Sequence, residues 1–400
     1  MSNPRLPEET LDHIVDHLHD SKLALKNCCL VSKTWIPRAR NHLFAEISFP
    51  REQDVESWKK TFPDHQTSPA YYAKTLRIGF AHLLTPADGK PGSWIHGFSR
   101  VGHLELGSLG MFSYGPSATF VPLHGFSPVK SLLATFVIFS TSEIFDLILS
   151  FPLLEDLTMI AYTEMVPASV NGKATDGLSA VAPPSNPPVF TGSLELSQER
   201  GIGPIARRLL SLPSGIHFRK LKLMWHHEDD CFLTTALVRG CSSTLESLDI
   251  TYTSRCTSIR ACARTNNLMF PVRNEAASLD LSTATRLKDL VFRVQPYSVA
   301  WVTTALRAIT PRHRCIGQIS IYVLSNSSLG HNVRWAAGEQ VIGQWLDLDR
   351  LLVHLWESRS IRPKVRSKAL RKEKQAVGDR IGLLLPEITT RGIIDLAATE

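Results

Sequence analysis

The chain has 400 residues, of which 43% are hydrophobic and 20% charged, and its formal net charge is +7. This length predicts two structural units, or one repeat array with an appendage, and the composition is that of a globular protein with a sizeable core. The longest nearly unbroken apolar run, residues 132–139, is far shorter than the about 20 residues that span a bilayer. The N-terminal residues carry no secretory pattern. We therefore expect neither a transmembrane helix nor a membrane partner.

The positive charge is concentrated in one segment near the C-terminus. Residues 357–380 hold nine basic and three acidic side chains, so the remainder of the chain is close to neutral. A neutral body makes nucleic acid an unfavoured partner. The seven cysteines include no Cys-x-x-Cys pair, which is typical of reduced thiols. We therefore expect an intracellular protein of the cytoplasm, the nucleus or both.

The first fifty residues predict three short helices. Their apolar residues recur at the three- and four-residue spacing of a single helix face. Asp20 or Ser21 can cap the second helix, because a side-chain oxygen there accepts hydrogen bonds from free N–H groups of the first turn. Pro37 fits the first turn of the third helix. The three apolar faces are formed by Leu11, Ile14, Val15 and Leu18, then by Leu25, Cys28, Cys29 and Val31, and then by Trp35, Ala39 and Leu43.

These helices carry more apolar side chains than they can enclose. A unit of about 45 residues is near the lower size limit of a chain that buries enough surface alone. Some of its leucines, isoleucines and aromatic residues must therefore face the rest of the chain or a partner. The alternative is a helical cap that packs only on its own chain.

The same segment, residues 4–50, resembles an F-box. The matching residues are Leu6-Pro7-x-Glu9-Thr10-Leu11-x-x-Ile14, His17-Leu18, Leu25, Cys28-x-Leu30-Val31-Ser32-Lys33-x-Trp35, Ala39-Arg40 and Leu43-Phe44-x-x-Ile47. In that family the F-box binds a small Skp-type adaptor, which links it to a cullin ubiquitin ligase. The resemblance implies that residues that contact the adaptor, together with residues that hold the helices together, are found among Leu6, Pro7, Leu11, Ile14, Leu18, Leu25, Cys28, Val31 and Trp35.

Residues 70–330 repeat a pattern of strands and helices. The motif is an apolar residue, two further residues, an apolar residue, one further residue and an apolar residue, and its middle positions recur 25–42 residues apart. Most steps fall within or next to the range of about 20–29 residues of leucine-rich repeats. The two longest steps coincide with expected insertions at residues 165–192 and 254–278. This body resembles the irregular leucine-rich repeats of many F-box proteins, whose units stack into a solenoid.

The body departs from a regular repeat in one respect. The Asn or Cys expected three residues after the last apolar position is absent, so an asparagine ladder cannot form. The predicted fold class is α/β, with an N-terminal three-helix F-box followed by an irregular leucine-rich-repeat-like solenoid with C-terminal capping helices. The alternative is a mixed α/β domain of another kind.

Residues 331–400 are expected to close the array. The amphipathic helical pattern of residues 341–356 would cover the open face of the last repeat. Residues 351–363 are similar to segments of the expanded fungal F-box families. The basic run that follows is expected to be a solvated helix or tail, and the alternatives are binding of an acidic partner or nuclear import.

Two short motifs raise the question of enzymatic chemistry. Gly201-Ile202-Gly203-Pro204-Ile205-Ala206 matches a loose dinucleotide fingerprint, but a turn followed by proline at the first helical position explains it better. His226-His227-Glu228-Asp229-Asp230 could suggest a metal site, but an acidic turn is the commoner meaning. Cys256 and Cys262 lack the flanking Cys or His residues of a zinc site. We expect no catalytic residue, no cofactor and no metal.

The sequence therefore predicts a protein that is not an enzyme. The main hypothesis is a substrate-recruiting receptor subunit of an SCF-type ubiquitin ligase. It would bind a Skp-type adaptor through the F-box, a cullin through that adaptor, and an unknown protein target through the repeat surface. The alternative is an F-box scaffold that does not direct degradation, and a nucleotide-binding enzyme is less favoured.

Overall fold

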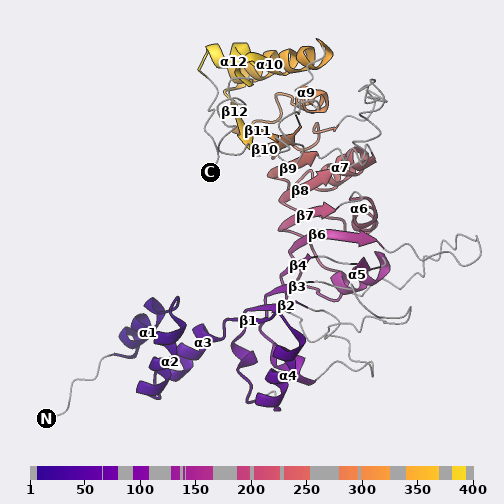
Figure 1. Ribbon diagram of the computed structural model, residues 1–400. Helices are drawn as coiled ribbons and strands as arrows, with labels where there is room; N and C mark the ends of the chain where they lie inside the picture. Colours follow the sequence, from indigo (N-terminus) through magenta and orange to yellow (C-terminus); the bar gives the residue numbers. More distant parts are fainter. Residues whose placement is uncertain are drawn as a thin grey trace, which may run out of the picture. The chain divides into compact units, whose positions relative to one another are not determined.

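The structure is a computed structural model of the chain (Figure 1). It describes residues 7–64, 66–79, 93–107, 128–135, 138–139, 141–164, 187–198, 202–225, 229–252, 279–295, 299–324, 339–368 and 381–392. The chain forms two compact units, Met1–Val189 and Phe190–Glu400. The expected insertions at 165–192 and 254–278 lie largely outside the described residues.

The N-terminal unit begins with three helices, α1 (Glu8–His17), α2 (Lys22–Val31) and α3 (Ile36–Leu43). The Ser21 side chain accepts a hydrogen bond from the backbone N–H of Ala24 at 3.3 Å, which confirms the predicted cap of α2. Pro37 stands in the first turn of α3, where no backbone N–H is needed.

A parallel sheet follows directly after α3. Its strand order is β1-β2-β3-β4-β6, and the two-residue strand β5 pairs with β6. The remaining elements in chain order are β1 (Glu46–Phe49), α4 (Glu52–Thr61), the 3-10 helix η1 (Pro69–Tyr72), β2 (Thr75–Ile78), η3 (Ser93–Gly97), β3 (His103–Leu106), β4 (Ser131–Thr135), β5 (Ile138–Phe139), α5 (Thr141–Leu149) and β6 (Asp156–Glu164).

The C-terminal unit contains a second run of parallel strands in the order β7-β8-β9-β10-β11-β12. Figure 1 shows α6, α7 and α9 on one side of these strands. The elements are β7 (Ser193–Gln198), α6 (Gly203–Leu210), β8 (Lys220–Trp225), α7 (Asp229–Gly240), β9 (Ser247–Tyr252), β10 (Asp289–Val294), α9 (Ala300–Arg307), β11 (Gln318–Leu324), α10 (Glu339–Arg359), β12 (Arg362–Lys368) and α12 (Pro386–Thr390).

The repeated apolar motif supplies the buried side of both runs of parallel strands. Successive residues of a strand point to opposite faces, so every second side chain turns to the core. In the N-terminal unit the middle positions of the motif pair directly across strands, and all are buried: Leu76, Leu104, Leu132 and Leu157. In the C-terminal unit the corresponding buried row is Leu194, Leu221, Leu248, Leu290 and Ile319.

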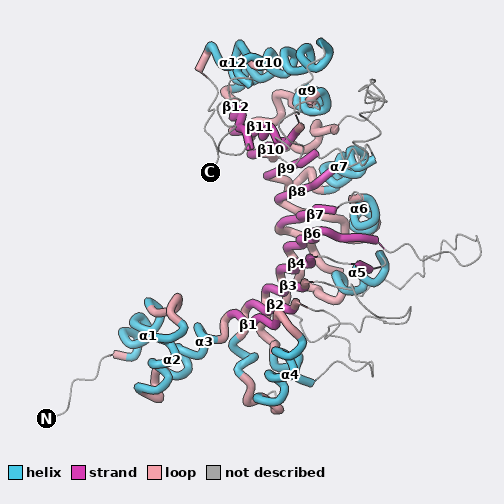
Figure 2. The backbone as a smooth tube through the Cα atoms, in the orientation of Figure 1, coloured by secondary structure: helices cyan, strands magenta, loops and turns pink. Residues whose placement is uncertain are grey.

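The predicted fold class is wrong in its specific form. The structure has an α/β arrangement in which long runs of parallel strands alternate with helices (Figure 2), and it does not define a three-helix F-box followed by a leucine-rich-repeat solenoid. Residues 46–49, expected to complete the three-helix segment, are the first strand of the sheet. The physical reason is that parallel strands are joined by crossovers of a dozen or more residues, usually a helix. Each strand with its amphipathic helix therefore repeats its apolar residues at a similar spacing in any parallel sheet, not only in a leucine-rich repeat.

The C-terminal segment also differs from the prediction. Helix α10 is not followed only by a tail, because a further paired strand, β12, comes after it in the chain. The first part of the basic run is not a solvated helix or tail, because residues 362–368 form β12. Ser360 adopts a left-handed conformation (φ 56°) between α10 and β12, which allows the chain to turn directly from the helix into the strand.

A buried carboxylate joins α10 to α12. Asp349 of α10 accepts hydrogen bonds from the backbone N–H groups of Glu387 at 2.8 Å and Ile388 at 3.1 Å. Burial raises the pKa of Asp349, and the two N–H donors oppose this shift. The carboxylate thus serves α12 as an N-terminal cap supplied by another helix.

No helix in the described ranges combines the length and the apolar character needed to cross a membrane.

Candidate docking surface

Helices α1, α2 and α3 enclose a small apolar core. Val15, Leu25, Cys28 and Ala39 are buried, and one of them comes from α1, two from α2 and one from α3. Partly buried hydrophobic side chains pack around this core: Leu18, Cys29, Trp35 and Leu43. The core is small, as expected for helices of eight to ten residues.

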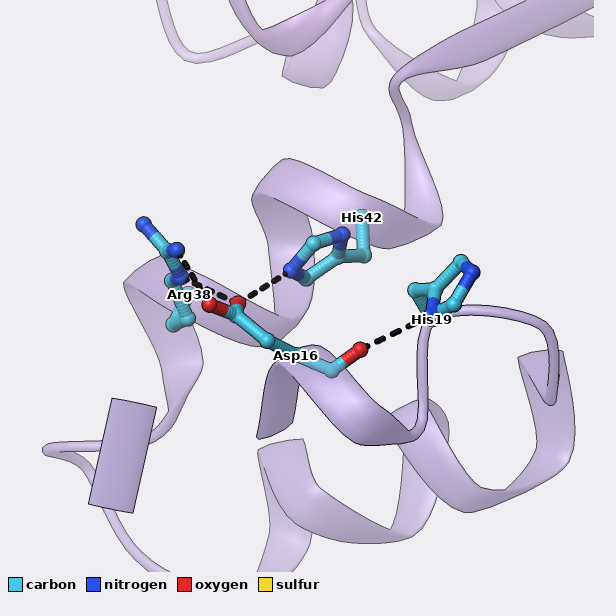
Figure 3. Close-up of polar contacts among 4 residues, drawn as sticks. All are labelled: Asp16, His19, Arg38 and His42. Carbon is cyan, nitrogen blue, oxygen red and sulfur yellow. Dashed lines mark hydrogen bonds and ion pairs between the residues drawn. The ribbon is translucent and has the colours of Figure 1, made fainter. Parts of the chain in front are cut away.

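A polar cluster ties α1 to α3 beside this core. Arg38 Nε and Nη2 donate hydrogen bonds of 2.6 Å to the two carboxylate oxygens of Asp16, and His42 Nε2 lies 2.7 Å from Asp16 Oδ1 (Figure 3). The backbone carbonyl oxygen of Asp16 lies 2.8 Å from Nδ1 of His19. The two-pronged contact with a guanidinium is the geometry that a carboxylate binds best.

The charge of Asp16 is stabilised by this cluster. The hydrogen bonds from Arg38, then that of His42, hold the pKa of the Asp16 carboxyl well below its usual range. The three side chains keep between 24% and 38% of their surface exposed, so solvent screens the attraction. The cluster therefore sets the angle between α1 and α3 more than it adds stability.

The structure divides the nine predicted adaptor-binding residues into groups. Leu25 and Cys28 belong to the buried core, and Leu18 and Trp35 pack against it. Leu11 is half-buried. Their burial and packing are those of side chains that hold the helices together.

The remaining predicted residues are open to a partner. Ile14 is 40% exposed and Val31 is 68% exposed. Pro7 is exposed just before α1. Leu6 lies outside the described residues.

Leu23 and Leu30 are not among the nine predicted residues, yet they are more exposed than the large hydrophobic residues of that set that the structure describes. Leu23 is 71% exposed and Leu30 is 86% exposed. They are seven residues apart on α2 and therefore share one face, which we call the α2 apolar stripe. Leu25 and Cys28, on the opposite side of α2, point into the core. A helical projection of α2 would have revealed the stripe, because its inward side was already assigned to Leu25 and Cys28.

The dinucleotide-like motif does not leave a helix N-terminus open for phosphate. Helix α6 begins at Gly203, and the backbone N–H of Ile202 donates a hydrogen bond of 3.0 Å to Oδ1 of Asp230. A carboxylate of the chain thus occupies the place where a helix N-terminus binds an anion. A Cβ on Gly203 would meet only ordinary contacts, the nearest at 3.7 Å to Leu233. The motif is therefore explained by the packing of α6 on α7.

The possible metal motif is described only in part. His226, His227 and Glu228 lie outside the described residues, as do Cys256 and Cys262. The described residues contain no group of three or more His, Cys, Asp or Glu side chains that could hold a metal ion.

No protein-family model matches the chain, and no curated protein matches it. The fold and the site define an α/β protein that carries an exposed apolar stripe on a short N-terminal helix.

Proposed function

We propose that the chain is a substrate-recruiting subunit of an SCF-type ubiquitin ligase. Its N-terminal helices bind a Skp-type adaptor and, through it, a cullin, while the C-terminal unit binds a target protein. The F-box-like residue pattern of residues 4–50 supports this assignment. The observation that carries it is the α2 apolar stripe, because Leu23 and Leu30 point away from the core to which Leu25 and Cys28 of α2 belong.

The exposed stripe is large enough to contribute to a stable complex. Complete burial of one leucine side chain is worth about 1.5–3 kcal/mol. Leu23 and Leu30 together therefore offer roughly 3–6 kcal/mol before the entropy of association is subtracted. Ile14 and Val31 are further exposed apolar side chains on the same three helices. Apolar anchors on a helix are a common way for a helical partner to be recognised.

The buried thiols of Cys231 and Cys241 support the intracellular location that this function requires. Burial raises the pKa of Cys231 to about 11 and that of Cys241 to about 12. Such thiols are almost entirely protonated at neutral pH and serve as small apolar core residues. Their use in the core fits a reducing compartment.

The test is co-purification of the full chain with a Skp-type adaptor and a cullin. The informative variant is Leu23→Asp with Leu30→Asp, because both side chains are exposed and the core of the helices stays intact. A matched control is Leu153→Asp with Val189→Asp, two positions that are 53% exposed and lie outside α1, α2 and α3. We expect the first pair to lose the adaptor and the control pair to retain it.

Two results would contradict the proposal. One is adaptor recovery that is equal for the Leu23/Leu30 pair and the wild type. The other is the absence of any adaptor in the wild-type complex. If the adaptor binds but deletion of the chain leaves the levels of its co-purified proteins unchanged, the chain acts as a scaffold that does not direct degradation.

A further inference from the structure

The sheet of the C-terminal unit has a polar face on the side away from the buried leucines. Residues on this face alternate along each strand with the buried ones, as the pleat requires. Across the strands they form rows in register, of which the middle row is Glu195, Lys222, Asp249, Val291, Ser320 and Lys364. In the described part of the chain, α6, α7 and α9 lie on the other side of the strands (Figure 1).

Most charges on the first four strands of this face are neutralised in pairs. Lys222 Nζ lies 2.6 Å from Glu195 Oε1. Arg293 forms an ion pair with Asp249, and its guanidinium carbon lies 5.4 Å from the ring centre of Tyr322. These pairs leave strands β7 to β10 with little net charge on this face.

Strand β12 is different, because its outward residues are all basic. Arg362, Lys364 and Arg366 alternate with Pro363 and Val365, which are buried. The alternation places the three cations on the polar face. Among the described residues, no carboxylate lies within ion-pair distance of Arg362 or Lys364.

The neighbouring strand adds hydrogen-bonding groups and no acid. The residues of β11 in register with the three cations are Gln318, Ser320 and Tyr322. The Gln318 amide donates a hydrogen bond of 2.7 Å to the Ser320 hydroxyl. Arg362 and Lys364 are thus bordered by neutral polar side chains and form a basic strip at one edge of the face.

We propose that the basic strip binds an extended acidic peptide, with carboxylates at alternate residues, of a target protein. Alternate residues of an extended strand are about 6.6 Å apart, so Arg362 and Lys364 stand at the spacing of carboxylates two residues apart in an extended peptide. The exposed guanidinium of Arg362 can hold one carboxylate in a two-pronged contact, and the Lys364 ammonium can pair with a second. This proposal deepens the proposed function, on which it rests, by giving the chemical class of the recruited segment.

The rest of the face favours a peptide over a nucleic acid. The basic strip is a single strand wide, and neighbouring strands are about 4.8 Å apart. A chain of phosphates lying across the face would leave the cations of β12 and soon meet the exposed carboxylate of Asp289 on β10. A peptide can place carboxylates over β12 and uncharged residues over β11.

The test measures binding of a fluorescent peptide of about eight alternating Glu and Thr residues to the purified full chain. The probe variant is Arg362→Glu with Lys364→Glu. The matched control is Arg207→Glu with Arg307→Glu, which makes the same change of charge at exposed positions of α6 and α9. We expect the probe variant to bind the peptide at least about tenfold more weakly, and the control to keep most of the affinity.

Additional measurements with other ligands show whether the strip binds an acidic peptide, a nucleic acid or neither. A peptide with Gln in place of Glu should not bind, and salt should weaken binding of the Glu peptide. Equal peptide binding by probe and control variants, or no binding by the wild type, would overturn the proposal. Tighter binding of oligothymidylate, lost in the same probe variant, would assign the strip to nucleic acid. Circular dichroism and the less drastic pair Arg362→Gln and Lys364→Gln guard against misfolding.

The experiment is independent of the adaptor. The probe variant should still co-purify the adaptor, and the Leu23/Leu30 variant should still bind the peptide. A wild-type chain that binds the adaptor but not the peptide would therefore contradict only the basic strip, and a wild-type chain that binds the peptide but not the adaptor would contradict the ligase function.

Discussion

Arg38 of α3 holds the Asp16 carboxylate of α1 through two hydrogen bonds of 2.6 Å, and these residues are 22 positions apart in the chain. The contact connects the first and third helices at the rim of their shared core. A contact of this kind fixes how two short helices cross when the apolar core is too small to do so alone. Its loss should therefore change mainly how α1 and α3 cross, and should lower the local stability of the helices only slightly.

Replacement of Asp16 by Asn should remove both the charge and its pH dependence. The pKa of Asp16 is lowered in the fold, whereas in the unfolded chain it is about 3.9. Its contribution to stability is therefore present above about pH 4 and is lost as the pH falls toward the lowered value. Acid titration followed by tryptophan fluorescence should show a steeper loss of stability for the wild type than for Asp16→Asn. Parallel titration curves for the two proteins would contradict this role.

Leu25 and Leu23 offer a matched pair on α2. Leu25 is fully buried, so Leu25→Ala should reduce the stability of the three helices by about 2–4 kcal/mol. Leu23→Ala should change it by less than about 0.5 kcal/mol, because Leu23 is 71% exposed. Hydrogen exchange of the amides in residues 8–43 measures both effects. Similar exchange rates in the two variants would show that the assignment of inward and outward faces is wrong.

Asp349 should tolerate Asn better than Ala. Asp349→Ala leaves the N–H groups of Glu387 and Ile388 without their acceptor and should cost about 1–3 kcal/mol. Asp349→Asn keeps an acceptor oxygen and removes the buried carboxyl group, whose pKa is raised by burial. The protection of these two amides against exchange is the measurement. We expect it to disappear in the Ala variant and to persist partly in the Asn variant.

The buried cysteines should resist alkylation in the native protein. With a pKa of about 12, Cys241 has roughly one thiolate in ten thousand at pH 8. Cys231, with a pKa of about 11, is also buried, whereas Cys315 is exposed. Iodoacetamide followed by peptide mass spectrometry should label Cys315 first and the two buried thiols only after unfolding. Native labelling of Cys241 as fast as that of Cys315 would refute the assignment.

The local pattern of the sheet could be predicted from the sequence, and the fold class could not. The apolar motif located the row Leu76, Leu104 and Leu132, and these residues do pair across neighbouring strands. The motif reports only that a strand buries alternate residues and that a helix follows. It does not distinguish a leucine-rich-repeat solenoid from other parallel α/β arrangements, because both bury the same periodic positions.

One error and one question that the sequence left open have simple physical origins. The basic run was expected to be solvated because lysine and arginine rarely lie in a core, yet β12 needs to bury only Pro363 and Val365 between them. The candidate docking residues came from the resemblance, which could not separate residues of the core from residues of the surface. Residues such as Leu25 and Leu30 have the same chemistry, and only the direction in which each leaves α2 separates their roles.

The route of the chain from β11 through α10 to β12 affects how the C-terminal segment can be studied. A truncation at Arg359 would remove the basic residues, but it would also strip β11 of the partner to which seven of its residues are matched. Strand β11 (Gln318–Leu324) would become an edge strand with unpaired backbone N–H and C=O groups, through which copies of the shortened protein could aggregate. In a deletion experiment, loss of peptide binding could then result from insolubility of the shortened protein. This segment should therefore be examined by single substitutions in the intact chain.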